Sequence, residues 1–284
     1  MQSEVGHLER VLLRHARDAF ESREAVGAQW RALNYLAEPD FDEACREYDA
    51  FAGLLEELGA SIEWLDGVGP GLDSMYVRDA SIVADGGAIL CSMGKGARVP
   101  EPGAQGSMFE ALGTPVLGKI DTPGTIEGGD VAWLDERTLA VGRGYRTNDD
   151  GIAQLERFLP DVDVVRAPLP HFRGPADVFH LMSILSPLAE DLLLVYSPLM
   201  PVPFREMLLE RGFGLVEVPE AEYDSQGCNV LAVAPRVAVA LEGNPETRRR
   251  MESAGVEVHC FRGREISLKG CGGPTCLTRL LKRS

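Results

Sequence analysis

Reactive or polar side chains recur along this chain, each close to the start of a pair of short apolar runs. In chain order they are Asp79, Glu127 and Asp130, His180, Asn229 and Cys276. A cysteine, a histidine and a carboxylate at one place supply a nucleophile, a general acid/base and a group that orients the imidazole. If the fold brings them together, the sequence predicts covalent catalysis by Cys276, with His180 as the acid/base and Glu127 as its partner.

The segment CGGPTC around Cys276 is suited to presenting a thiol. Gly272 and Gly273 let the backbone approach a ligand closely, and Pro274 stiffens the chain just before the thiol. Cys271, five residues earlier, is the rival nucleophile. A buried and inert thiol is the alternative interpretation for any cysteine of this chain.

The histidine and the acids are less specific signals when each is taken alone. His180 lies in an apolar run, where a buried imidazole needs a polar partner, so a satisfied core histidine is the alternative. Glu127 opens the segment IEGGD, whose glycines would let Glu127 and Asp130 turn toward one site. An exposed turn would have the same composition.

The elements that must position these residues form a repeat. Paired apolar runs with strand character begin at intervals of 51, 47, 51 and 43 residues. A near-constant period of this size indicates an array of like modules. The pairs are DASIVADGGAILCS from Asp79, DVAWLDERTLAVG from Asp130, DVFHLMSILSPLAEDLLLVYS from Asp177, CNVLAVAPRVAVAL from Cys228 and CGGPTCLTRLL from Cys271.

Segments with helical spacing lie between the pairs, and a further strand follows each of them. Each module is therefore predicted to be hairpin, helix, strand, and the hairpin that begins at Cys271 would be completed by an N-terminal strand around Val11–Arg14. This closes the array into a ring and removes exposed strand edges. An open α/β sheet with crossover helices is the alternative. The predicted helices are Asn148–Leu159, Val202–Arg211 and Pro245–Ala254, and the strands that follow two of them are Val162–Arg166 and Val256–Phe261.

Composition limits the other classes of protein. With 284 residues, 45% of them hydrophobic, and no linker-like segment, we expect one domain over residues 1–284. A net charge of −16 argues against nucleic acid, which requires clustered Lys and Arg. We find neither a signal-peptide core nor an apolar run long enough to cross a membrane, so a cytoplasmic protein is expected. The six cysteines lack the paired spacing of a zinc site.

Several ordered motifs together resemble a known superfamily, and the resemblance runs nearly from end to end. The chain is similar to the amidinotransferases, arginine deiminases and dimethylarginine dimethylaminohydrolases, which share the five-module α/β propeller called the pentein fold. The motifs are DSMYVRD (73–79), IEGGD (126–130), GYRTN (144–148), FHLMS (179–183), GCNVLAV (227–233) and GGPTC (272–276).

The resemblance implies a role for each matching position. Cys276, His180 and Glu127 match the catalytic triad, no cofactor or metal is needed, and the partner is a small cationic guanidine. Substrate-binding roles are implied for Asp79 toward the guanidinium, Asp73 toward an amino group, Arg146 and Arg98 toward a carboxylate, and for Arg78 and Asp130 beside them in the motifs.

Two departures bear on which guanidine is bound. Deiminases and amidinotransferases typically carry an aspartate two residues after the catalytic histidine, where this chain has Met182. Dimethylarginine hydrolases also lack that aspartate, which leaves room for N-substituents and favours a substituted guanidine such as methylarginine. Those hydrolases often have an acid where this chain has Arg78, so the substrate's amine can be placed differently or be missing.

Four other possibilities remain at this stage. An arginine deiminase or an amidinotransferase would use the same triad, and a pentein that only binds a partner would not need it. A zinc hydrolase using histidine and cysteine lacks short ligand spacings. A homodimer is compatible with the sequence, which does not reveal the oligomeric state.

Overall fold

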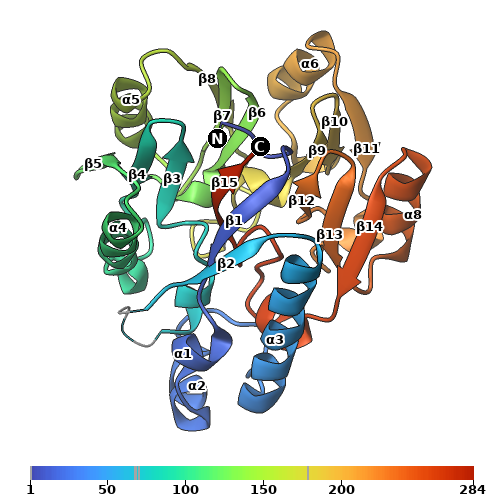
Figure 1. Ribbon diagram of the computed structural model, residues 1–284. Coiled ribbons are helices and arrows are strands. Elements are labelled where there is room, and N and C mark those ends of the chain that lie inside the picture. The colour runs from blue at the N-terminus through green and yellow to red at the C-terminus, as the bar shows by residue number, and fades with distance from the viewer. Residues whose placement is uncertain (1, 67–68, 70, 178) are drawn as a thin grey trace.

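Five three-stranded sheets surround a common centre in the computed structural model, which describes residues 2–66, 69, 71–177 and 179–284 (Figure 1). The sheets are β15-β1-β2, β3-β4-β5, β6-β7-β8, β9-β10-β11 and β12-β13-β14. Their strands are β1 (Leu8–Leu13), β2 (Ser61–Trp64), β3 (Ser81–Ala84), β4 (Gly87–Leu90), β5 (Val116–Lys119), β6 (Val131–Asp135), β7 (Thr138–Arg143), β8 (Asp163–Pro168), β9 (Leu185–Ala189), β10 (Leu192–Val195), β11 (Gly214–Glu217), β12 (Leu231–Ala234), β13 (Val237–Leu241), β14 (Glu257–Phe261) and β15 (Arg279–Arg283).

Each sheet is built in the same way. Two antiparallel strands are followed by a helix and then by a strand parallel to the middle one, as in β6, β7, α5 and β8. The helices are α1 (Ala16–Phe20), α2 (Arg23–Gln29), α3 (Phe41–Glu57), α4 (Glu101–Ala111), α5 (Asp149–Phe158), α6 (Val202–Glu210), α7 (Glu220–Tyr223) and α8 (Pro245–Ser253). The three predicted helices and the two strands that follow them are confirmed to within two residues at each end, and β1 begins three residues earlier than the predicted N-terminal strand.

Local sequence explains where these helices begin. The Asn148 side chain accepts a hydrogen bond from the Gly151 amide at 2.8 Å and so caps α5, while α6 and α8 begin with a proline in their first turn. Both features satisfy or remove amide donors that a helix start leaves without a partner.

The fifth sheet joins the two ends of the chain. Strand β15 pairs antiparallel with β1, and β1 pairs parallel with β2. The backbone of His7 exchanges two hydrogen bonds with that of Ser284, at 2.8 and 3.0 Å, and both ends lie near the middle of the ring in Figure 1. The closed ring is therefore confirmed, and the alternative of one open sheet with crossover helices is wrong.

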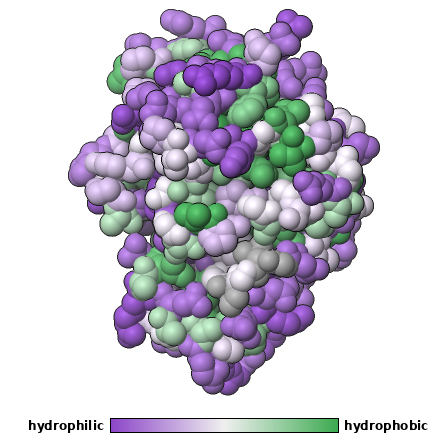
Figure 2. Space-filling view, turned by 90° about the vertical axis from the view of Figure 1, so that its left-hand side faces the viewer, coloured by the Kyte–Doolittle hydropathy of each residue, from purple (hydrophilic) through white to green (hydrophobic). Residues whose placement is uncertain are grey.

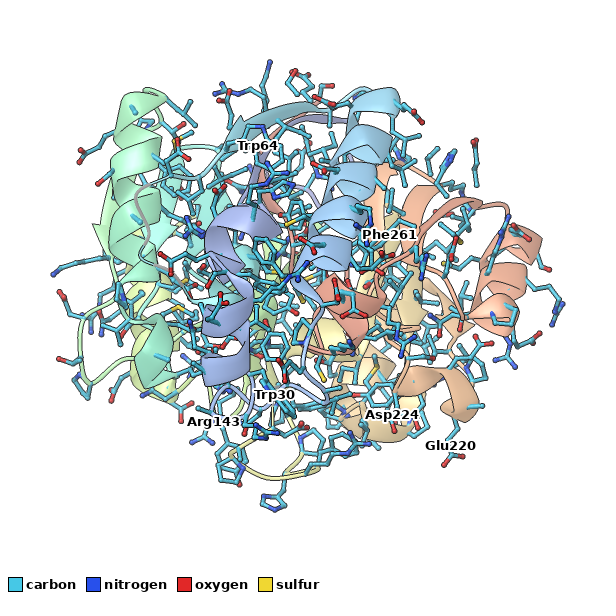
Figure 3. The ribbon with its side chains drawn as sticks, turned by 90° about the horizontal axis from the view of Figure 1, so that it is seen from below. Trp30, Trp64, Arg143, Glu220, Asp224 and Phe261 are labelled. Carbon is cyan, nitrogen blue, oxygen red and sulfur yellow. The ribbon has the colours of Figure 1, made fainter. Side chains whose placement is uncertain are left out.

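The hydrophobic core is divided among the modules and continues beneath the helices. Helix α3, capped by Asp40, buries Tyr48, Phe51 and Leu55. The rings of Phe51 and Phe261 lie 4.7 Å apart, and Figure 3 shows Phe261 beside this helix. Burying each side chain of this size contributes roughly 1.5–3 kcal/mol, so packing of this kind holds the helices on the ring.

A buried ionic cluster ties the N-terminal segment to the first and second hairpins. The Arg78 guanidinium donates to both carboxylate oxygens of Glu4, at 2.7 and 3.2 Å, and to the carbonyls of Gly128 and Val131. Burial opposes the ionisation of Glu4, but the charge and hydrogen bonds of Arg78 lower its pKa. The carboxylate is therefore ionised and connects elements that are distant in sequence.

The surface is largely polar. Hydrophilic residues cover most of the face in Figure 2, and hydrophobic residues occur there in small groups. Among the described residues, none of the helices is long and apolar enough to cross a membrane.

Candidate active site

A cavity of about 300 Å³ lies where the hairpins begin. Short 3₁₀ helices precede β6 and β9, and Glu127 and His180 stand at their starts. Both residues line the cavity. Every module contributes to its lining. The lining includes Asp79, Glu127, His180, Asn229 and Cys276, which the repeat predicted to converge, and Asp73, for which the resemblance implied a substrate-binding role.

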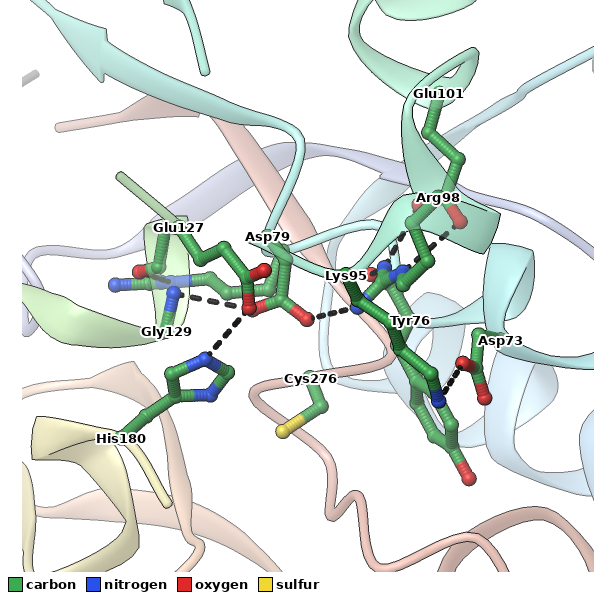
Figure 4. Close-up of polar contacts among 12 residues, drawn as sticks. Asp73, Tyr76, Asp79, Lys95, Arg98, Glu101, Glu127, Gly129, His180 and Cys276 are labelled. Atoms are coloured by element: carbon green, nitrogen blue, oxygen red, sulfur yellow. Dashed lines mark hydrogen bonds and ion pairs between the residues drawn. The ribbon is translucent and has the colours of Figure 1, made fainter. Parts of the chain in front are cut away.

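Glu127 and His180 form a buried pair. His180 Nε2 lies 2.9 Å from Glu127 Oε2 (Figure 4), and the Gly94 amide donates to Glu127 Oε1 at 2.9 Å. Burial opposes both charges, but the hydrogen bond and charge of His180 lower the pKa of Glu127, while nearby carboxylates raise the pKa of His180. The pair is therefore a carboxylate with an imidazolium, the form that can donate a proton.

The glycines of IEGGD are required by close approach. A side chain at Gly129 would lie 2.5 Å from the His180 ring and 2.8 Å from Asp79, and one at Gly128 would meet the Arg78 carbonyl at 2.1 Å. The Gly-Gly step therefore creates the space in which the acid and the imidazole meet.

Cys276 presents its sulfur to the same cavity. In Figure 4 the sulfur points toward the side on which the His180 imidazole lies, and the Asp79 carboxylate lies above both. Burial and the charge of Asp79 raise the pKa of the thiol to about 11, although hydrogen bonds from Asn229, Gly273 and Thr275 lower it. Without a bound cation the thiol is therefore protonated at neutral pH.

Asp79 and Arg98 are bound to each other, which differs from the role expected for Arg98. Asp79 accepts from the Gly129 amide at 3.1 Å and from Arg98 Nη1 at 2.5 Å. The Arg98 guanidinium also donates to both oxygens of Glu101 and to the Tyr76 carbonyl (Figure 4). All three guanidinium nitrogens thus have partners, and the structure places Arg98 behind Asp79, not free toward a substrate carboxylate.

The side chains of Arg78 and Asp130 are bound to other protein groups, although the motifs grouped both residues with the substrate-binding positions. Arg78 borders the cavity, but its guanidinium is bound to Glu4 and to carbonyls. Asp130 accepts from Thr147 Oγ1 at 2.7 Å and from the Leu181 amide at 3.0 Å. Each of these two side chains therefore holds one module to another. The prediction of a substrate-binding role failed because position in a motif does not reveal which way a side chain turns.

Asp73 and Arg146 line the cavity, and a lysine that we did not predict accompanies them. Lys95 Nζ lies 2.5 Å from Asp73 Oδ2 and donates to the Leu33 carbonyl at 3.0 Å. Arg146 Nη1 lies 3.4 Å from Glu127 Oε1. Lys95 stands three residues before Arg98 in the same segment, and nothing in the sequence distinguishes it from a surface lysine.

The wall next to His180 is aromatic and apolar. The rings of Phe172 and Phe179 lie 5.5 Å apart, and those of Phe172 and Tyr223 lie 6.0 Å apart. All three rings line the cavity together with Met182. The cavity therefore carries charged groups at Asp73, Lys95 and Arg146 and a group of aromatic and apolar side chains. The ion pair of Arg173 with Asp224 also lines it, with the Arg173 guanidinium 4.8 Å from the Phe172 ring.

The acids and the imidazole also satisfy the simplest requirement for a cation site. Ligand atoms of Asp79, Glu127 and His180 all lie within 4.8 Å of one another. Cys276 is outside this set. The same negative charge also suits a planar organic cation, which Asp79 could bind through paired hydrogen bonds.

The sequence of this chain matches a known protein family and known proteins. The family model described as arginine deiminase matches residues 68–203 and 201–283. The uncharacterized protein YkgA of Bacillus subtilis is 30% identical over 211 residues, which cover 74% of this chain and 70% of that protein.

Two solved structures share the fold. The N-terminal domain of ArgZ, an arginine dihydrolase from the ornithine-ammonia cycle in Cyanobacteria, has a TM-score of 0.81 at 20% identity, covering 96% of this chain and 97% of that one. A mutant of the dimethylarginine dimethylaminohydrolase (DDAH) of Pseudomonas aeruginosa, complexed with citrulline, has a TM-score of 0.74 at 22% identity, covering 96% and 98%. The predicted pentein fold is thereby confirmed.

Proposed function

Because the chain belongs to the arginine deiminase family, we propose that it hydrolyses a C–N bond of an arginine-like, N-substituted guanidine through a covalent intermediate on Cys276. The observation that carries this proposal is the convergence of Cys276, the His180–Glu127 pair and Asp79 on one cavity. Residues 1–284 would act as one catalytic domain, since the site takes side chains from every sheet.

The first half of the reaction forms the intermediate. Asp79 binds the guanidinium, and the bound positive charge offsets the carboxylate that opposes ionisation of Cys276, whose proton passes to solvent. Sulfur bonds to the guanidine carbon, and the C=N electron pair moves onto nitrogen. His180 protonates the leaving nitrogen, and the C–N bond breaks to leave an amine and a thiouronium on Cys276.

The second half releases the product. A water molecule gives its proton to His180 while its oxygen bonds to the thiouronium carbon. The C–S bond then breaks and the remaining hydroxyl proton passes to solvent, which releases a neutral ureido compound and restores the thiolate. Glu127 keeps the imidazole oriented in both halves and stabilises its charged form, which the proton from water restores. An amine that replaced water would accept the amidino group in the same way.

The wall beside His180 supports a substituted leaving nitrogen. Met182 stands where an aspartate would bind a second guanidine nitrogen, and Phe172, Phe179 and Tyr223 continue the apolar surface. An alkyl group on the leaving amine would bury apolar area there, at roughly 0.8 kcal/mol for each methylene. Methylarginine, yielding citrulline and an alkylamine, is the example we favour.

A panel of guanidines tests this function. We expect alkylamine release from methylarginines to exceed ammonia release from arginine in kcat/KM. Amines and ureido products would be measured separately, with and without glycine or ornithine as amidino acceptors. Faster ammonia release from arginine would instead establish the deiminase, which the family match favours as the second candidate. If transfer to an acceptor is the main reaction, the protein is an amidinotransferase. If no guanidine is turned over, the remaining candidate is a pentein that only binds a partner.

We also predict that Lys95→Met selectively lowers kcat/KM for substrates that carry a carboxylate. The Lys95–Asp73 pair is the electrostatic complement of an amino acid head group, with the carboxylate on Lys95 and the ammonium on Asp73. A lost charge-assisted bond of about 1.5–3 kcal/mol lowers kcat/KM for methylarginine by roughly ten- to a hundredfold. The corresponding methylagmatine, which lacks the carboxylate, should change little.

Lys95→Arg keeps the positive charge and is the control for this prediction. An equal loss for both substrates would remove Lys95 from head-group recognition. The same pair of substrates tests Arg146→Ala, which should raise KM mainly for the carboxylate-bearing one.

A further inference from the structure

Asn229 makes a direct contact with the sulfur of Cys276. It stands at the start of the fourth repeated hairpin, just before β12, and is 5% exposed. Its Nδ2 lies 3.2 Å from Cys276 Sγ, within hydrogen-bonding range for a sulfur acceptor. The asparagine therefore touches the atom that forms the covalent bond in the proposed reaction.

Neighbouring donors determine the orientation of this amide. Asn229 Oδ1 accepts from the Thr275 backbone amide at 3.1 Å and from the Thr275 hydroxyl. A backbone N–H cannot accept, so the oxygen of Asn229 must face Thr275 and its nitrogen must face sulfur. The contact is thus an N–H donor directed at Cys276.

Such a donor discriminates between the two forms of the sulfur. Hydrogen bonds to an ionised acceptor are roughly twice as strong as bonds to a neutral one. An N–H group at fixed position therefore stabilises a thiolate more than a thiol. Burial and Asp79 act in the opposite direction, so the donor is needed most before the substrate cation arrives.

The nucleophile loop is shaped to admit this side chain. A Cβ at Gly273 would lie 2.5 Å from both Cγ and Oδ1 of Asn229, so only glycine leaves the required space. The segments GCNV and GGPTC, 46 residues apart at Asn229 and Thr275, thus form one unit around the sulfur.

We propose that Asn229 is the thiolate-stabilising residue of this site, holding the sulfur of Cys276 in place and favouring its ionised form. The proposal rests on the proposed role of Cys276 as nucleophile. It adds a residue from the fourth module to a triad drawn from the second, third and fifth.

The rate of alkylation by iodoacetamide, measured against pH, tests the proposal. A Cys271→Ser background removes the other half-buried thiol of the cavity, and mass spectrometry follows modification at Cys276. Asn229→Ala should move the midpoint to higher pH by about one unit, a tenfold smaller thiolate fraction at a given pH below the midpoint, with the limiting rate at high pH retained. Asn34→Ala, which removes a cavity-lining asparagine that does not contact sulfur, should leave the midpoint unchanged.

Asn229→Asp is the second variant, in case the alanine variant does not fold. Aspartate can still accept from Thr275 but, when ionised, has no donor for sulfur, so its midpoint should also rise. A midpoint equal to that of the unaltered chain in either variant would overturn the proposal, as would a lower limiting rate at an unshifted midpoint. Failure of the proposed function is distinct, because Cys276 would then form no adduct with any guanidine in the unaltered chain.

Discussion

Replacing Cys276 by serine is expected to lower kcat for every guanidine substrate by at least about 10³-fold. Serine is the smaller and far less acidic nucleophile, and neither the His180–Glu127 pair nor Asp79 can form the C–S bond in its place. Steady-state assays would measure the loss. Mass spectrometry of quenched reactions should show an adduct on Cys276 in the unaltered chain and none in the variant.

Cys271→Ser is the matched control. Cys271 lines the same cavity five residues earlier, and burial raises the pKa of its thiol. Its substitution should leave kcat within about a factor of two, because its sulfur contacts the Leu268 carbonyl and no member of the triad. Loss of the adduct in this variant, and not in Cys276→Ser, would transfer the nucleophile to Cys271.

Glu127→Gln should lower kcat by roughly 10²- to 10⁴-fold. The amide keeps nearly the same shape but removes the charge that faces His180 at 2.9 Å. The pKa of His180 then falls, because burial continues to oppose the imidazolium while Asp130 and Asp79 alone favour it.

The sign of the pH effect follows from the role of the imidazolium. Activity that requires protonated His180 disappears as pH rises through the pKa of His180, which is raised in the unaltered chain. The alkaline limb of the kcat profile should therefore move to lower pH in Glu127→Gln. Glu127→Asp, which keeps the charge on a shorter side chain, is the comparison. An unmoved limb in Glu127→Gln would show that Glu127 does not set the protonation of His180.

The architecture was predictable because each repeated hairpin carries its own apolar pattern. Periodicity indicated the strands, and the period indicated the modules, so hairpins beginning near Asp79, Asp130 and Cys271 implied a ring. The convergence of Glu127, His180 and Cys276 followed from that ring, since each occupies an equivalent place in its module.

The partners of the charged side chains were not predictable in the same way. Arg98 meets Asp79 and Glu101, and Lys95 meets Asp73, through contacts that depend on how side chains turn. Motif spacing identifies which residues approach the centre. It does not identify which of them are already neutralised by a neighbour, and this decides whether an arginine remains free for a substrate.

The pairing of β15 with β1 has a consequence for biosynthesis. Leu8 faces Arg283 across the sheet, so this contact closes a loop of nearly the whole chain. Such distant pairings are slow to form, because chain entropy is lost before the contact stabilises anything. Strand β1 can pair with β2 once residues 61–64 have been made, but its pairing with β15 must wait for residues 279–283. The nucleophile arrives with the same segment, so a nascent chain acquires its chemistry only as the ring closes.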